Sequence, residues 1–240
     1  MRFQSYALSD IGRKRRTNQD AFYRDDAAGF FIVADGMGGH KGGEVASQLT
    51  IDVLNKFNSE NEALGGRELL TRGVNKASEE VFERAKTSPD LTGMGTTLIA
   101  LLFKEGCAYI AQVGDSRAYL IRPEGQWQLT EDHSLLNEEI RAGKVSPAEA
   151  SQYQFRNVIT RSVGYEDKVI VDIYRRAVGE GDIFLACTDG LSGLVDLAEI
   201  GEEIRKSGLE VGIPNLVALA NARGGDDNIT VIAVRPLPAG

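Results

Sequence analysis

Acidic side chains stand at the ends of several apolar segments of this sequence. Asp35, Asp115 and Asp189 each close a short apolar run, and Asp227 opens another. Carboxylates at strand ends can converge on one rim of a sheet, where their like charges repel unless they are protonated or neutralised by cations. Hard divalent cations such as Mg²⁺ and Mn²⁺ prefer such oxygen ligands. We therefore expect a divalent-metal site at this rim.

A simpler interpretation is that each aspartate only caps a turn. Asp-Gly pairs such as Asp35-Gly36 and Asp189-Gly190 are frequent in turns. Turn capping explains any one position about as well as metal binding does, but it explains the joint pattern poorly. Because the sequence does not show that the aspartates meet, both interpretations stay open at this level.

The glycine-rich segment 36–43 follows an expected strand and precedes an expected helix, an arrangement that also binds nucleotide phosphates. The segment has no Gly-x-Gly-x-x-Gly pattern and no Gly-Lys-Ser/Thr ending. Asp35, which opens it, would repel a pyrophosphate unless a metal lay between them. The spacing therefore disfavours a Rossmann or Walker nucleotide site.

The elements that must position these residues are short strands and long helices. Runs rich in β-branched and aromatic residues predict strands at 3–8, 30–34, 96–103, 108–113, 118–122, 169–174, 183–187 and 229–234. Links such as 104–106 are too short for a helical crossover, so the strands should pair largely antiparallel.

Two long helices are expected between the strands, because apolar residues recur there at helical spacing. The two stripes are Val45, Leu49, Val53 and Phe57, and Leu70, Val74, Ala77 and Val81. Further helices are expected at 196–206 and 214–222, the second with Pro214 in its first turn. The segment 131–153, interrupted by Pro147, predicts a small helical insertion.

Composition limits the class of protein and its partners. The chain has 240 residues, 42% of them hydrophobic, which fits one α/β domain with a sizeable core. Its net charge of −8 disfavours broad contact with nucleic acid or an anionic membrane, and the basic run 13–16 is a local exception interpreted as a solvated loop. No apolar stretch approaches the roughly 20 residues of a membrane span. We expect a cytoplasmic protein with neither nucleic-acid nor membrane partners.

Six motifs of the sequence resemble those of the protein phosphatase 2C family, the metal-dependent protein phosphatases, and most closely its bacterial stand-alone catalytic domains. In the family's order they are Arg15-Arg16-Thr17-Asn18-Gln19-Asp20, Val33-Ala34-Asp35-Gly36-Met37-Gly38-Gly39, Gly93-Met94-Gly95-Thr96-Thr97, Val113-Gly114-Asp115-Ser116-Arg117, Thr188-Asp189-Gly190-Leu191 and Gly225-Asp226-Asp227-Asn228-Ile229-Thr230. The resemblance runs nearly end to end. It implies an α+β fold, a four-layer α-β-β-α sandwich with two largely antiparallel sheets flanked by helix pairs. Residues 1–240 would form one catalytic domain, with 131–164 as a flap insertion.

The resemblance also implies a ligand set for two or three Mn or Mg ions. Asp35 would bridge two ions, the Gly36 carbonyl would ligate one of them, and Asp189 and Asp227 would ligate the other. Asp20 would act through bound water.

Two more roles follow from the same resemblance. Asp115 would form a third-metal site with Asp189, and Arg15 would hold the substrate's phosphoryl oxygens through its planar fork of donors. Arg15 and Asp35 are thus the expected catalytic residues.

The implied activity is hydrolysis of phosphoserine and phosphothreonine in other proteins. Two cations about 3.5 to 4 Å apart would lower the pKa of a shared water, which would attack phosphorus in line. The expected partners are phosphorylated proteins and a cognate Ser/Thr kinase pathway, and we expect a monomer.

The sequence leaves the leaving-group acid and one alternative function open. Some eukaryotic members carry a histidine where this chain has Met37. His40 is nearby but favours a structural interpretation, and His133 fits packing better than substrate contact. A catalytically silent pseudophosphatase that binds a phosphoprotein or regulatory partner is the alternative, although the presence of every motif aspartate and of Arg15 weighs against it.

Overall fold

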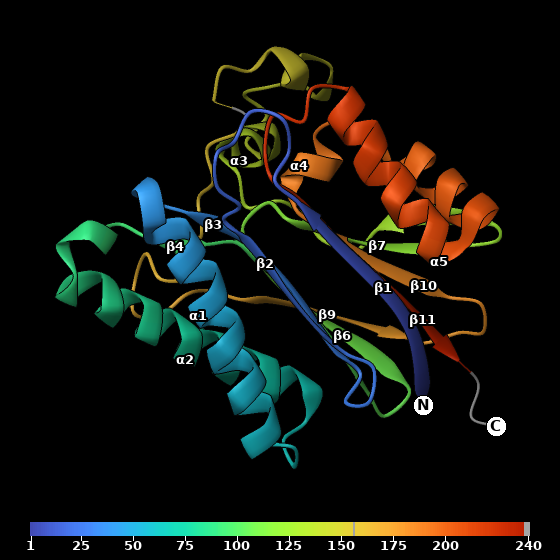
Figure 1. Cartoon of the computed structure of the whole chain (residues 1–240), viewed down its shortest axis with the longest axis horizontal. Helices are drawn as coiled ribbons and strands as arrows, with labels where there is room; N and C mark the ends of the chain where they lie inside the picture. Colours follow the sequence, from blue (N-terminus) through green and yellow to red (C-terminus); the bar gives the residue numbers. More distant parts are fainter. Residues whose placement is uncertain (156, 238–240) are drawn as a thin grey trace.

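The computed structural model describes residues 1–155 and 157–237, without the side chains of residues 40, 147 and 151 (Figure 1). The sequence prediction for His40 as an acid therefore lies outside the described side chains, and Arg156 of the expected flap lies outside the described residues. No helix in the described part of the chain is both long enough and apolar enough to cross a membrane.

One sheet has five strands, each antiparallel to its neighbours. Their order is β1 (Arg2–Asp10), β11 (Ile229–Leu237), β10 (Ile183–Cys187), β7 (Arg117–Arg122) and β8 (Gly125–Gln128). The first and last strands of the chain, β1 and β11, pair along their whole length. Arg2 therefore lies beside Leu237.

The second sheet is also antiparallel. Its order is β2 (Asp20–Asp25), β3 (Phe30–Met37), β5 (Leu98–Lys104), β6 (Cys107–Val113) and β9 (Asp172–Ala177), and the short β4 (Gly95–Thr96) pairs with the end of β3. The expectation of largely antiparallel pairing is confirmed.

Helices cover the outer face of each sheet, as Figure 1 shows. The long helices α1 (Gly39–Glu60) and α2 (Gly66–Thr87) pack on the second sheet, and α5 (Leu197–Ala222) with the short α4 (Asp189–Ser192) packs on the first. The predicted four-layer sandwich is confirmed. Outside these layers lie α3 (Leu135–Arg141) and the 3₁₀ turns η1 (Pro89–Leu91) and η2 (Pro147–Gln152).

The strands at the centre are apolar on both faces because both faces are buried. Phe30, Ile32 and Ala34 of β3 pack toward α1 and α2, whereas Phe31 and Val33 pack between the two sheets. This alternation follows from the two-residue period of a strand. Each of the Phe, Ile and Val side chains among these contributes about 1.5–3 kcal/mol when fully buried. The sandwich thus holds the strand ends in fixed positions.

Several element boundaries differ from the sequence prediction. β2 and β8 were not predicted, because both are edge strands with few buried residues. The two predicted C-terminal helices are both present within α5, separated at Gly208, whose φ of +72° is non-helical, and the second begins earlier than predicted, with Pro214 in its interior. In α1 the predicted stripe is only half-buried, and the fully buried face lies one residue further on, at Ala46, Thr50 and Leu54.

Candidate active site

The predicted carboxylates come from both sheets and meet where the strands end. Asp20 begins β2 and lies directly opposite Asp35 of β3 in the antiparallel register. Asp115 follows β6 in the turn to β7. Asp189 begins α4 directly after β10, and Asp227 precedes β11. The sandwich therefore brings distant parts of the sequence to one edge, which turn capping alone did not require.

Two adjoining cavities open at this edge. The first, of about 360 Å³, is lined by Arg15, Gln19, Asp35, Gly36, Met37, Gly38, Gly39, Thr97, Asp115, Asn157, Ile159, Asp189, Asp227 and Asn228. The second, of about 390 Å³, shares Asp115, Asn157, Asp189 and Asp227 with the first and extends toward α3. Every predicted site residue except Asp20 lines the first cavity, and Asp20 lies next to it through its pairing with Asp35.

Burial and mutual repulsion disfavour negative charge on the two paired aspartates. Burial, with added repulsion from Asp189 and Asp227, raises the pKa of Asp20 to about 7, although the Thr188 hydroxyl donates to its Oδ2 at 3.0 Å. Burial and then the charge of Asp20 raise the pKa of Asp35 well above its usual range.

The pKa values of two further carboxylates in the cavity, Asp115 and Asp189, are also raised. Burial, with the nearby charges of Asp189 and Asp132, raises the pKa of Asp115 to about 7. Burial, with the charge of Asp227, raises the pKa of Asp189. Such a group of carboxylates is stable in its charged form only with compensating positive charge.

The donor set fits hard divalent cations. Asp20 Oδ1 and Asp189 Oδ1 are buried and have no hydrogen-bond partner within the described residues. Buried polar atoms of this kind usually have a partner, so these two oxygens indicate a missing ligand. Carboxylate oxygens of this number suit Mg²⁺ or Mn²⁺.

The carboxylates are not yet arranged as a finished coordination shell. Among the described residues, no group of three or more His, Cys, Asp or Glu side chains has the arrangement needed to hold a metal ion. Asp227 is held by protein donors, since its Oδ2 accepts from Arg15 Nη2 at 2.6 Å and its Oδ1 accepts from the Asn228 N–H at 2.8 Å. Each of these oxygens keeps a second lone pair that can face a cation.

The loop that carries Arg15 is held by the same motif that carries Asp227. Asn228 Nδ2 donates to the carbonyls of Ile11 and Thr17 at 2.9 and 3.1 Å, and its Oδ1 accepts from the Gln19 N–H at 2.8 Å. Asn228 is 4% exposed, so these bonds are shielded from water. This role of Asn228 was not predicted, although Asn228 lies in the same motif as Asp227.

Thr97 links the turns of two predicted site residues. Its Oγ1 accepts from the Asp35 N–H at 3.1 Å and lies 2.7 Å from the Ser116 hydroxyl, next to Asp115. Its own N–H donates to the Asp35 carbonyl at 2.9 Å. Thr97, which lies between β4 and β5, was also missed, because a threonine at the start of the predicted strand 96–103 gives no signal of its own.

Gly36 has no room for a side chain. A Cβ at this position would lie 2.0 Å from the Gly43 carbonyl oxygen and 2.6 Å from that of Gln19. The close approach lets the backbone at Gly36 line the cavity beside Asp35. Met37 lines the same cavity and offers no acidic proton.

His133 is enclosed by protein groups. Its side chain is 4% exposed, its Nδ1 lies 3.1 Å from the Gly114 nitrogen, and its Nε2 lies 3.0 Å from Asp172 Oδ2. These contacts favour the packing interpretation over substrate contact.

Comparison with known proteins identifies the family and agrees with the fold. The family model described as protein phosphatase 2C matches residues 12–207. The serine/threonine phosphatase stp of Listeria innocua is 40% identical, with 94% of this chain and 93% of that protein aligned. Protein phosphatase PhpP of Streptococcus pneumoniae is 36% identical over 95% of each chain.

Solved structures show the same likeness. The Mycobacterium tuberculosis serine/threonine phosphatase PstP/Ppp superposes with a TM-score of 0.92 at 33% identity, covering 98% of this chain and 99% of that one. A structure of the PstP catalytic domain in complex with two manganese ions superposes with a TM-score of 0.87 at 33% identity, covering 98% of each chain.

The sandwich is that of the bacterial protein serine/threonine phosphatases. Within that class, the chain belongs to the protein phosphatase 2C family.

Proposed function

We propose that this chain hydrolyses phosphoserine and phosphothreonine in other proteins with the help of bound divalent cations. Its family and its relatives, named serine/threonine phosphatases, indicate a protein serine/threonine phosphatase enzyme. The observation that carries the proposal is the convergence of Asp35, Asp115, Asp189 and Asp227 with Arg15 on one cavity.

Each carboxylate would have its own role in holding the cations. Asp35 is central, since it is paired with Asp20 and repelled by Asp189, Asp227 and Asp115. Asp35, the Gly36 carbonyl, Asp189 and Asp227 would hold two ions, and Asp20 would act through water. Asp115 with Asp189 would hold a third.

Arg15 would bind the substrate phosphoryl group. Its guanidinium is half exposed at the cavity and already holds a carboxylate, Asp227, at 2.6 Å. A phosphoryl oxygen is a similar acceptor, and the planar fork of arginine can bind two oxygens at once. Arg15 has further N–H donors beside the one bound to Asp227, and these can bind the substrate.

Bound divalent cations supply a water acidic enough to serve as nucleophile near neutral pH, and they offset the charge of the phosphoryl group. The chain's own part is to hold them, to orient the phosphoryl group through Arg15, and to enclose both within the cavity. No protein nucleophile is needed, so no phosphoenzyme is expected.

The wider setting is part of the same proposal. Residues 1–240 would act as one catalytic domain with 131–164 as its flap. The enzyme would act as a cytoplasmic monomer on phosphoproteins of a Ser/Thr kinase pathway.

A panel of matched phosphopeptides tests the activity. The purified chain, with Mn²⁺ or Mg²⁺, should release phosphate from phosphoserine and phosphothreonine peptides faster than from the phosphotyrosine peptide of the same sequence. EDTA should stop the release. A folded protein that stays inert across the whole range of metal concentrations would contradict the proposal and favour a pseudophosphatase.

A further inference from the structure

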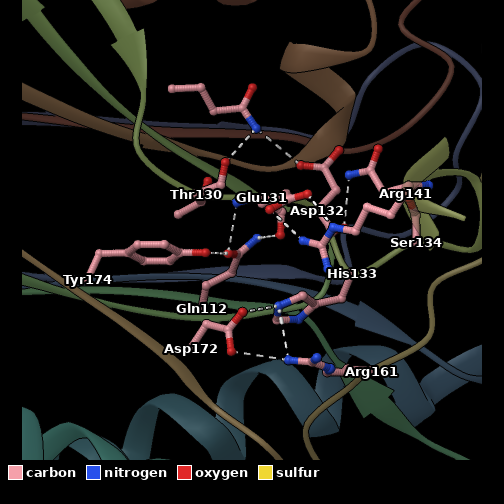
Figure 2. A network of polar contacts seen from close by, with 12 residues as sticks. Gln112, Thr130, Glu131, Asp132, His133, Ser134, Arg141, Arg161, Asp172 and Tyr174 are labelled. Carbon is pink, nitrogen blue, oxygen red and sulfur yellow. Dashed lines mark hydrogen bonds and ion pairs between the residues drawn. The ribbon is translucent and has the colours of Figure 1, made fainter. Parts of the chain in front are cut away.

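The segment 129–134, which joins β8 to α3, is bound along its length to the strands on either side of Asp115. Leu129 N–H donates to the Ala118 carbonyl at 2.8 Å, and Ala118 N–H donates to Thr130 Oγ1 at 3.0 Å. Further along, Gln112 Nε2 donates to the Glu131 carbonyl at 2.9 Å, and Gln112 Oε1 accepts from the Glu131 N–H at 3.2 Å (Figure 2). The segment therefore frames the turn from β6 to β7.

His133 holds both peptide groups of Gly114, the residue before Asp115. Its main-chain N–H donates to the Gly114 carbonyl at 3.0 Å, and its Nδ1 accepts from the Gly114 N–H at 3.1 Å. Gly114 has φ of +95°, and a Cβ there would lie 2.7 Å from Thr97. On the other side of Asp115, the Ser116 hydroxyl contacts Thr97. Asp115 thus lies between two anchored neighbours.

The hydrogen bonds assign the tautomer of His133. Since Nδ1 accepts a hydrogen bond from the Gly114 N–H, the ring proton must be on Nε2, which donates to Asp172 Oδ2 at 3.0 Å. Arg161 Nη1 lies 3.3 Å from the same Nε2, but two donors cannot bond, and Arg161 donates to Asp172 Oδ1 at 3.2 Å instead. Figure 2 marks all three close contacts among His133, Asp172 and Arg161 with dashed lines, including the one between Arg161 and Nε2 that this tautomer excludes as a hydrogen bond.

The surroundings of His133 favour its neutral form. Burial lowers the pKa of His133, and the positive charges of Arg161 and Arg141 act in the same direction, whereas Asp172 opposes them. A protonated ring would carry a proton on Nδ1 and could no longer accept from Gly114.

We propose that His133 is a positioning residue for Asp115. As the neutral Nε2–H tautomer held by Asp172, it accepts the Gly114 N–H and fixes the turn that places Asp115 in the cavity shared with Asp189. The inference rests on the proposed function, since it takes Asp115 as a cation ligand. Residues behind a ligand typically change metal affinity about 10- to 100-fold when they are replaced.

Two replacements of His133 separate its two hydrogen bonds. In His133→Asn the amide oxygen can take the place of Nδ1 and accept from Gly114, although the contact with Asp172 is lost. In His133→Gln the amide nitrogen can reach Asp172, but no acceptor faces Gly114. The readout is Mn²⁺ binding to the metal-stripped protein, measured by calorimetry without substrate.

We expect Mn²⁺ affinity to fall in only one of the two variants. His133→Gln should weaken the Asp115-dependent binding step about 10- to 100-fold, and His133→Asn should largely retain it. The step is identified as the one that Asp115→Ala removes. Adding His133→Gln to Asp115→Ala should cause no further loss, since residues that act as a unit are not additive. Equal losses in the two His133 variants, or additive effects with Asp115→Ala, would overturn the inference.

Nitrogen NMR of the imidazoles gives a readout that needs no bound metal. The chain has two histidines, so a His40→Gln variant assigns the signals of His133. Near pH 7, Nε2 of His133 should carry the proton and Nδ1 should not. The opposite tautomer, or a doubly protonated ring, would overturn the inference.

The outcomes also separate this inference from the proposed function. If Asp115→Ala binds as many ions as the unaltered protein does, the positioning role is wrong while the phosphatase activity stands. If the unaltered protein binds ions at Asp115 but releases no phosphate, the proposed function is wrong while the positioning role stands.

Discussion

Asp20 lies directly opposite Asp35 where β2 pairs with β3, so two carboxylates face each other at the start of one strand and near the end of the other. Like charges directly opposite in a sheet are destabilising. Asp189 and Asp227, from the other sheet, add to the repulsion at both. The pairing is therefore stable only with protons or cations between the carboxylates.

Acidification should stabilise the metal-free protein. The pKa values of Asp20 and Asp115 are about 7 in the folded state, against 3.8 for an ordinary aspartate. Between these two pKa values the folded state therefore binds more protons than the unfolded state does. The added stability is present at low pH and is lost as the pH rises through 7. His133 acts in the opposite direction because its pKa is lowered. Urea unfolding in EDTA should give a free energy of unfolding about 1–3 kcal/mol larger at pH 6 than at pH 8.

A stability in EDTA that is equal at the two pH values, or larger at pH 8, would contradict this linkage. Asp115→Asn serves as the matched variant, since it keeps the size of the side chain and removes one of the two titrating groups. The free energy of unfolding of Asp115→Asn should change less between pH 6 and pH 8 than that of the unaltered protein.

Cation binding near pH 7 should release protons. Asp20 and Asp115 are each partly protonated there, and a cation bound to a carboxylate or close to it favours the charged form, so the proton is released. Calorimetry of Mn²⁺ binding in two buffers with different ionisation enthalpies measures the release. A binding enthalpy that does not depend on the buffer would show that the carboxylates are already charged.

Asp35→Asn should abolish hydrolysis and stabilise the metal-free protein. The substitution removes the central charge of the cluster while keeping the shape of the side chain. Phosphate release should fall by at least about 1000-fold, which corresponds to about 4 kcal/mol of barrier, whereas the melting temperature in EDTA at pH 8 should rise. Activity close to that of the unaltered protein would contradict the role of Asp35, and a lower melting temperature would contradict the repulsion.

Arg15→Lys should weaken binding of the substrate phosphoryl group while the cations stay bound. Lysine keeps the charge but lacks the planar fork, so kcat/KM for a phosphothreonine peptide should fall about 10- to 100-fold. Arg16→Lys in the same exposed loop is the matched control and should change little. If the two variants lose activity equally, the effect belongs to the loop as a whole rather than to Arg15.

Much of the fold could be predicted because the inner strands are apolar on both faces. Runs such as 30–34 and 183–187 are buried between helices and the opposite sheet, so their composition alone indicates strands. β2 was missed because an edge strand with the sequence Asp20–Asp25 buries little. The helical spacing of apolar residues predicted α1 correctly, but it did not predict which face of α1 is most buried. That face depends on how α1 packs on β3.

The carboxylates could be named from the sequence because each stands beside an apolar run. Their partners could not. Thr97 and Asn228 act through backbone groups of segments distant in sequence, and only the folded chain brings Asn228 to Ile11 and Thr17. The same holds for His133, whose two contacts, Gly114 and Asp172, come from different segments.

The central claim is that these aspartates hold divalent cations at one edge of the sandwich. Anomalous diffraction at the manganese edge from crystals grown with Mn²⁺ tests it most directly. We expect two peaks about 3.5–4 Å apart, with Asp35 between them and with Asp189 and Asp227 beside one. Crystals of active protein with no manganese at Asp35, or with manganese bound only elsewhere, would contradict the account.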